Sequence, residues 1–113
     1  MIDQVKEFQK FRKKMNQKIL ENAGLETKRF MALDKNAYKE GALTKKTKEL
    51  MGLTASLVLR CDDCIRYHLI TSVEMGITDP QLYEAFHIAL VVGGTIVIPH
   101  VRRAVDFLEN LRS

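Results

Sequence analysis

The sequence predicts an all-α protein of about six helices. Apolar residues recur three and four positions apart along most of the chain, and the alternation typical of strands is nearly absent. Residues that break helices are sparse, with six Gly and two Pro among 113 residues. A hydrophobic fraction of 46% and a charged fraction of 28% are typical of a globular chain. Because this length supports one core, we expect residues 1–113 to form a single domain.

The first two helices are predicted from their apolar spacing. An amphipathic helix is expected within residues 1–24, ending near Gly24, because glycine suits the position after a helix. Its apolar positions are Phe8, Phe11, Met15 and Ile19. A second helix over residues 26–40 should stop at Gly41. Its apolar positions are Phe30, Leu33, Ala37 and Tyr38.

The next two helices are delimited by residues that favour helix ends. A third helix should begin after Thr44, a good N-cap residue, and run to about Leu59. It is apolar over most of its circumference, so it should be central or buried by a second subunit. A fourth helix should open near Cys61 and run to Met75, with Gly76 as its stop.

Proline and glycine residues delimit the last two helices. Thr78 is a predicted N-cap, and Pro80 should lie in the first turn of a helix that ends at Gly93-Gly94. The final helix is expected over residues 95–111. Pro99 must lie in its first turn or kink it.

The charge distribution restricts the classes of partner. Net charge is +4, with 14 Lys and Arg against 7 Asp and Glu in residues 1–60, and 4 against 7 in residues 61–113. The positive residues are interleaved with acids and accompany no recognition motif, so nucleic acid is not an expected partner. A solvated helix face or an intersubunit contact accounts for them instead.

The apolar segments argue against a membrane location. The first residues lack the apolar run typical of a signal peptide, so we expect neither a signal peptide nor a membrane anchor there. The longest apolar stretch, residues 88–98, is interrupted by Gly93-Gly94, whereas a membrane span needs ~20 apolar residues. The chain is therefore expected to be cytoplasmic.

Thiol chemistry is indicated by the segment Cys61-Asp62-Asp63-Cys64-Ile65-Arg66-Tyr67-His68. On a continuous helix, Cys61, Cys64 and His68 would share one narrow face, and Cys64 should touch His68 four residues later. The pKa of a thiol, about 8.5, falls at a helix N-terminus and beside a base, and a second nearby thiol can close a disulfide. His68 is the evident proton acceptor for Cys64. Glu49, on an apolar face of the preceding helix, is the candidate to orient it.

The spacing Glu49-x11-Cys61-x2-Cys64-x3-His68 resembles the signature of the AhpD-like alkylhydroperoxidases within the carboxymuconolactone decarboxylase superfamily. Similarity covers residues 25–111. It includes the arginine before the first Cys, the turn at Gly76 followed by Thr78-Asp79, and Gly93-Gly94. The resemblance implies an all-helical homo-oligomer, a trimer or a hexamer, with the thiols in a pocket near the subunit interface.

The resemblance also implies a role for each residue of the motif. Cys64 would be the peroxidatic thiol and Cys61 the resolving thiol, with His68 and Glu49 as the proton relay. The expected function is an antioxidant peroxidase that reduces hydroperoxides and is recharged by an unidentified thiol or dithiol electron donor. No cofactor and no metal are expected.

Other functions stay open at this point. Some related peroxidases carry a histidine before the second Cys, whereas here Asp63 follows Asp62, and two carboxylates oppose formation of a thiolate. A low peroxidase rate would indicate a thiol–disulfide oxidoreductase or a redox-responsive protein. A carboxymuconolactone decarboxylase-type enzyme is less expected, because that branch lacks the C-x-x-C motif. A non-enzymatic oligomeric interaction module would use the basic first half to bind an acidic protein.

The same residues also have purely structural interpretations. The cysteines can be small buried hydrophobes, or, with His68, three ligands of a zinc site that needs four. Glu49 can be a first-turn acid that complements the helix dipole. Residues expected in the core, at the surface or at an interface, and not in the site, are Arg66, Tyr67, His87 and His100.

Overall fold

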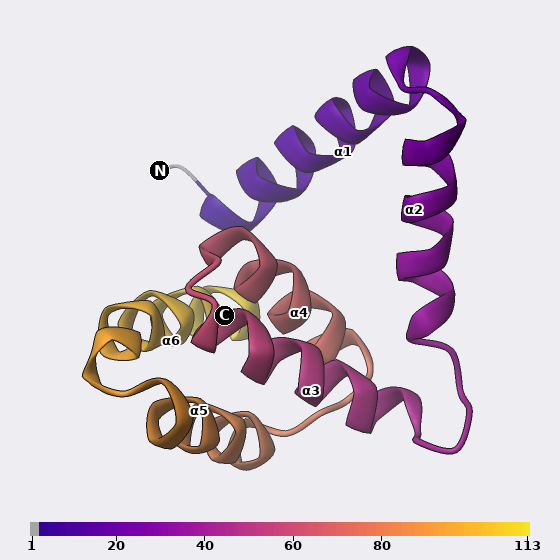
Figure 1. The fold of residues 1–113 in the computed structure, drawn as a ribbon. Helices are drawn as coiled ribbons and strands as arrows, with labels where there is room; N and C mark the ends of the chain where they lie inside the picture. The colour runs from indigo at the N-terminus through magenta and orange to yellow at the C-terminus, as the bar shows by residue number, and fades with distance from the viewer. Residues whose placement is uncertain (1–2) are drawn as a thin grey trace. The chain divides into compact units, whose positions relative to one another are not determined.

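The computed structural model describes residues 3–113. Over this range the chain forms six α-helices, one short 3-10 helix and no strand (Figure 1), so the predicted all-α class is confirmed. The chain divides into two compact units, Met1–Lys39 and Glu40–Ser113. That both units form one domain stays a prediction. None of the described helices is long and apolar enough to cross a membrane.

The first unit is a pair of helices, α1 (Gln4–Asn22) and α2 (Leu25–Ala37). Asp3 caps α1, because its carboxylate accepts two first-turn backbone N–H groups at 3.0 and 3.1 Å. The expected role of Gly24 is wrong: α1 ends two residues earlier, and Gly24 is the extended N-cap of α2. The described part of each helix contains no buried residue. Phe8 and Met15 are half-buried, whereas Phe11, Phe30 and Leu33 are exposed.

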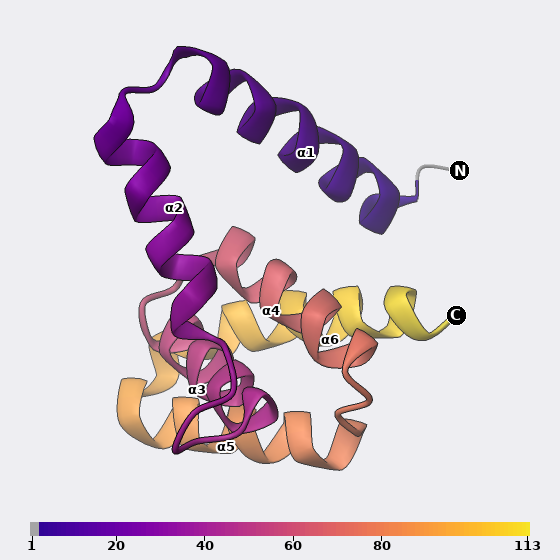
Figure 2. The same cartoon turned by 90° about the vertical axis from the view of Figure 1, so that its right-hand side faces the viewer.

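The second unit is built around α3 (Lys45–Val58), which lies between α4 (Asp62–Glu74) and α5 (Asp79–Gly93), as Figure 1 and Figure 2 show. A 3-10 turn, η1 (Thr95–Val97), leads into α6 (Ile98–Arg112), which packs against α4. The predicted central position of α3 is therefore confirmed within this unit.

Short-range signals set the helix ends of the second unit. The Thr44 hydroxyl accepts a first-turn N–H of α3 at 3.1 Å, and Thr78 forms a reciprocal capping box on α5. Gly76 and Gly94 have φ angles of 80° and 83°, which glycine adopts without strain. The prolines that lie in first turns, as expected, are Pro80 and Pro99.

The core of the second unit takes one face from each of its helices. Fully buried apolar side chains include Leu53, Leu57, Ile65, Leu69, Leu82, Phe86 and Phe107. Each such side chain contributes roughly 1.5–3 kcal/mol to folding. Two ionisable side chains, Glu49 and His68, are buried in the same unit. Burying such groups is costly unless they bond to each other or to another polar group.

Candidate active site

A tight turn between α3 and α4 carries the first cysteine. Arg60 has a φ of 61°, a left-handed conformation that costs a non-glycine residue roughly 1–2 kcal/mol. Cys61 is then extended, with φ −101° and ψ 95°, and forms the N-cap of α4. Cys64 and His68 do lie one turn apart on α4. Cys61 stands at the N-terminus of the same helix as its cap, with extended backbone, so the expected continuous helix begins one residue after it.

Cys61 and Cys64 form a disulfide, with their Cα atoms 5.3 Å apart. The Cys61 sulfur also accepts the backbone N–H of Cys64 at 3.2 Å. This bond places the sulfur at the N-terminus of α4, where the first N–H groups of a helix favour negative charge. Cys64 is exposed and Cys61 half-buried, so the interpretation as small core hydrophobes is wrong. A reagent in solution reaches Cys64 first.

His68 is paired with Glu49 across the contact between α4 and α3. The Nδ1 atom of His68 lies 2.5 Å from Oε1 of Glu49. The two residues are only 7% and 3% exposed. An ionised carboxylate can only accept, so Nδ1 carries the proton and donates it, and in neutral His68 the acceptor nitrogen is Nε2. The first turn of α3 contains no acidic residue, so Glu49 is not a helix-dipole residue.

The site therefore combines an accessible pair of sulfurs with a buried imidazole whose orientation is set by a carboxylate. Such a group can accept a proton from a thiol and return it to a leaving oxygen. The transfer from Cys64 requires the reduced protein and stays a prediction. Within residues 3–113, no group of three or more His, Cys, Asp and Glu side chains is arranged to hold a metal ion.

Asp62, between the two cysteines, is held by two side chains of α6 that sequence reasoning left outside the site. His100 Nδ1 lies 2.8 Å from Oδ1 of Asp62, and Arg103 Nε donates to Oδ2 at 3.0 Å. Burial raises the pKa of Asp62, but the bond to His100 and the charge of Arg103 outweigh it and hold the pKa below its ordinary value. His100 is half-buried and contacts the residue that follows Cys61, a neighbour of the thiols that the spacing of His100 along the chain did not indicate.

Arg66 and Tyr67 are half-buried in the second unit, in partial agreement with their expected place at a surface or interface. The Arg66 guanidinium carbon lies 5.6 Å from the centre of the Phe107 ring, a cation–π contact between α4 and α6. The Tyr67 ring meets the His68 ring edge-on, with centroids 5.3 Å apart. His87 is exposed on α5.

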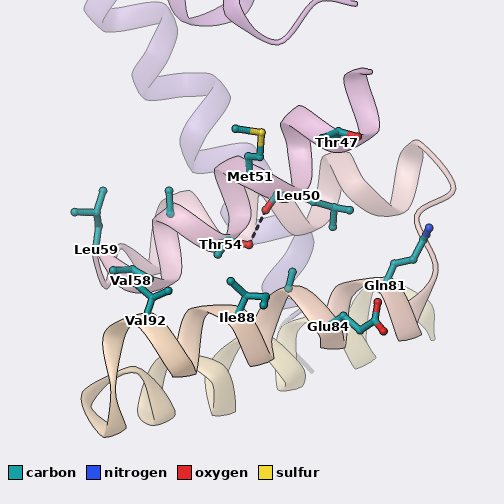
Figure 3. A pocket seen from close by; sticks show the side chains of 12 residues that line it. Thr47, Leu50, Met51, Thr54, Val58, Leu59, Gln81, Glu84, Ile88 and Val92 are labelled. Atoms are coloured by element: carbon teal, nitrogen blue, oxygen red, sulfur yellow. Dashed lines mark hydrogen bonds between the residues drawn. The ribbon is translucent and has the colours of Figure 1, made fainter. Parts of the chain in front are cut away.

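An apolar groove lies between α3 and α5, with a volume of about 760 Å³ (Figure 3). Thr47, Gln81 and Glu84 line its polar end, and Val58, Leu59 and Val92 line the opposite end. Glu49 and the buried leucines lie on the core side of α3, so the groove uses the other side of the same helix. It is a surface separate from the Glu49–His68 pair.

Sequence comparisons find relatives over most of the second unit and part of the first. Residues 25–107 match the family model of the carboxymuconolactone decarboxylase family. The chain is 30% identical over 82 residues to uncharacterized protein 4 in the cox locus of Paracoccus denitrificans, over 73% of this chain and 74% of that protein. It is 34% identical over 64 residues to the alkyl hydroperoxide reductase AhpD of Corynebacterium kroppenstedtii, over 57% of this chain and 37% of that protein.

Two crystal structures of carboxymuconolactone decarboxylase family proteins are similar to this chain. One, from Thermotoga maritima, is described in connection with an antioxidative response. It has a TM-score of 0.90 and 58% identity, over 94% of this chain and 90% of that chain. The other, from Legionella pneumophila, has a TM-score of 0.90 and 27% identity, over 99% of this chain and 100% of that chain.

Proposed function

Because the chain belongs to the carboxymuconolactone decarboxylase family, we propose that it is an AhpD-like peroxidase that reduces hydroperoxides through a dithiol–disulfide cycle of Cys61 and Cys64. The observation that carries this proposal is the disulfide at the start of α4, on the same helix as the buried His68–Glu49 pair. The similarity to an alkyl hydroperoxide reductase supports it. A disulfide without the buried His68–Glu49 pair, or the pair without the disulfide, would indicate this function less specifically.

The proposed cycle starts from the dithiol. His68 accepts the thiol proton of Cys64, and Glu49 stabilises the imidazolium that results. The Cys64 thiolate attacks one peroxide oxygen, the O–O bond breaks, and the departing oxygen takes the proton and leaves as an alcohol. Cys64 is then a sulfenic acid. The Cys61 thiolate attacks its sulfur, hydroxide leaves and is protonated to water, and the disulfide forms. A thiol or dithiol donor returns two electrons by exchange.

A thiol–disulfide oxidoreductase is the second candidate function, and the surroundings of Cys64 favour it. Asp63 is exposed beside the exposed Cys64, and a carboxylate there opposes formation of the attacking thiolate. In exchange that starts from the Cys61–Cys64 disulfide, the partner supplies the attacking thiolate, so this chain needs only an accessible sulfur. Comparing the rate of hydroperoxide consumption with the rate of reduction of a small-molecule disulfide separates the two candidates.

The test of the proposed peroxidase cycle is mass spectrometry of the reduced protein after one equivalent of a hydroperoxide. We expect loss of two hydrogens and a peptide pair linked through Cys61 and Cys64. His68→Gln should slow this oxidation, whereas His87→Gln, which changes an exposed histidine on α5, should not. If both thiols stay reduced under conditions that oxidise cysteine in solution, the redox function is refuted.

We also propose that the chain assembles into a closed homo-oligomer, a trimer or a hexamer. Large apolar side chains that stay exposed on α3 and α5 support this proposal, among them Met51, Leu59, Ile88, Val91 and Val92. Of these, Met51, Leu59, Ile88 and Val92 line the α3–α5 groove (Figure 3). A contiguous exposed apolar surface of this kind typically marks an interaction site. A second copy supplies a matching apolar surface by symmetry.

A further inference from the structure

The carboxylate of Asp62 is held in place by two bonds from a helix distant in sequence. It follows Cys61 directly in the chain and stands in the first turn of α4. Its two oxygens bind His100 at 2.8 Å and Arg103 at 3.0 Å, both from α6. His100 Nδ1 lies 2.8 Å from Asp62 and 3.2 Å from Nη2 of Arg103. A carboxylate without a proton only accepts, so in the shorter contact Nδ1 donates to Asp62. Each oxygen of Asp62 thus receives one donor from α6.

This arrangement changes the charge that the sulfurs experience. Asp62 and Asp63 are the two residues between Cys61 and Cys64 in the chain, so both acidic side chains stand in the first turn of the helix that the cysteines begin. The side chain of Asp62 is only 35% exposed, so water screens its charge less than that of the exposed Asp63. The guanidinium of Arg103 offsets the charge of Asp62, and the hydrogen bond from His100 disperses it further. Without them, a thiolate formed at Cys61 would stand beside an uncompensated carboxylate.

Resting on the proposed dithiol–disulfide cycle, we propose that His100 and Arg103 are positioning residues that raise the reduction potential of the Cys61–Cys64 disulfide by holding and neutralising Asp62. The role lies in the thiol exchange that recharges the site. Neither residue touches a reacting atom in this role. Each acts through the carboxylate of Asp62.

The exchange shows where the charge matters. A thiolate of a dithiol donor attacks the exposed Cys64 sulfur, the Cys61–Cys64 bond breaks, and Cys61 leaves as a thiolate next to Asp62. The second thiol of the donor, as its thiolate, then attacks the donor sulfur of the mixed disulfide. Cys64 departs as a thiolate that takes a proton, and the donor becomes a disulfide, so two electrons have passed to the protein. Negative charge at Asp62 disfavours the departure of Cys61, and Arg103 relieves this opposition.

The test measures the reduction potential of the full chain in buffers of reduced and oxidised glutathione at neutral pH, with the dithiol fraction read by alkylation and mass. Arg103→Gln should shift the equilibrium toward the disulfide by about 3- to 10-fold, since a unit charge acts at short range near a protein surface. A tenfold change corresponds to about 30 mV for this two-electron couple. Asp62→Asn should shift the equilibrium toward the dithiol. The double variant should return close to wild type.

The matched control is Arg102→Gln, which removes the same charge from an exposed neighbour on α6. It should move the potential much less than Arg103→Gln does. Arg103→Lys keeps the charge and should recover part of the wild-type value. If Arg103→Gln does not fold, the sign of the Asp62→Asn shift still decides. A shift of Asp62→Asn toward the disulfide, or no shift, overturns the proposal.

The outcomes also separate this proposal from the proposed function. If the two single variants shift in the same direction, or Arg102→Gln matches Arg103→Gln, a cycling disulfide remains and only the role of His100 and Arg103 is lost. If wild-type thiols form no disulfide at any ratio of the glutathione buffer, the dithiol–disulfide cycle itself is refuted. A purely structural anchor between α4 and α6 would lower thermal stability in the variants and leave the potential unchanged.

Discussion

Replacement of Glu49 by Gln tests whether the buried carboxylate acts on the thiols. Glutamine keeps the shape of the side chain and can still accept the hydrogen of His68 Nδ1 through its amide oxygen. What it removes is the negative charge 2.5 Å from the ring nitrogen. The proposed cycle needs that charge, because His68 becomes a cation when it takes the proton of Cys64. The variant should therefore slow the thiol reaction with little change in folding.

The magnitude follows from the distance and the burial of the pair. Two unit charges about 4 Å apart interact by about 4 kcal/mol at the effective dielectric constant of a protein site near the surface. Glu49 and His68 are 3% and 7% exposed, so screening by water removes little of this energy. Since about 1.4 kcal/mol corresponds to a tenfold rate change, we expect a loss of about 10²- to 10³-fold. Exchanging a charged for a neutral hydrogen bond should cost folding about 1 kcal/mol.

The assay is the rate of Cys64 alkylation between pH 5 and 10 in a Cys61→Ser background, with and without Glu49→Gln. In that background Cys64 is the single thiol of the chain. The Glu49→Gln profile should lie below its parent at neutral pH and reach its half-maximal rate at a higher pH. Glu74→Gln, which removes an exposed carboxylate at the end of α4, is the matched control and should leave the profile unchanged. Superimposable profiles with and without Glu49→Gln would remove Glu49 from the site.

Three further predictions address the thiols, the assembly and the charge cluster. Cys61→Ser should trap a sulfenic acid on Cys64 after hydroperoxide treatment, and detection of that species only on Cys61 in Cys64→Ser would reverse the assignment. Light scattering at micromolar concentration should give the mass of a trimer or hexamer that Ile88→Lys breaks apart, whereas a monomeric wild type would contradict the assembly. Asp62→Asn should lower the free energy of unfolding at neutral pH by at most about 1 kcal/mol, because Asp62 is one-third exposed. The pKa of Asp62 in the folded protein lies below its ordinary value of 3.8, so this difference should be full above pH 3.8 and disappear as the pH falls through the folded value; an unchanged difference in acid would refute it.

Sequence signals that act within one helical turn predicted the structure well. Thr44 and Thr78 cap α3 and α5, and Gly76 ends α4 in a left-handed turn. These positions are readable because capping depends on the side chain and backbone of residues three or four apart. The first unit was harder. Gly24 begins α2 instead of ending α1, and α2 ends at Ala37, before the expected residue 40. Exposed helices without buried contacts offer little periodic signal at their ends.

In the candidate site, too, some features could be predicted from the sequence and others depend on the tertiary structure. The sequence by itself determined the pairing of Glu49 with His68 and the proximity of Cys61 and Cys64, since a carboxylate on an apolar helix face requires a partner and the cysteines are three residues apart. Only the tertiary structure decided two features, which are the backbone turn before Cys61 and the contacts of α6 with Asp62. The left-handed turn before Cys61 places it outside α4.

Packing of α6 on α4 brings His100 and Arg103 to Asp62 across 38 and 41 residues of chain. Helical periodicity tells which side of a helix faces the core, and it carries no information on which polar residues of another helix will meet that helix at its end. That choice depends on the register and crossing of the packed helices, which the interlocking side chains of the whole core determine together.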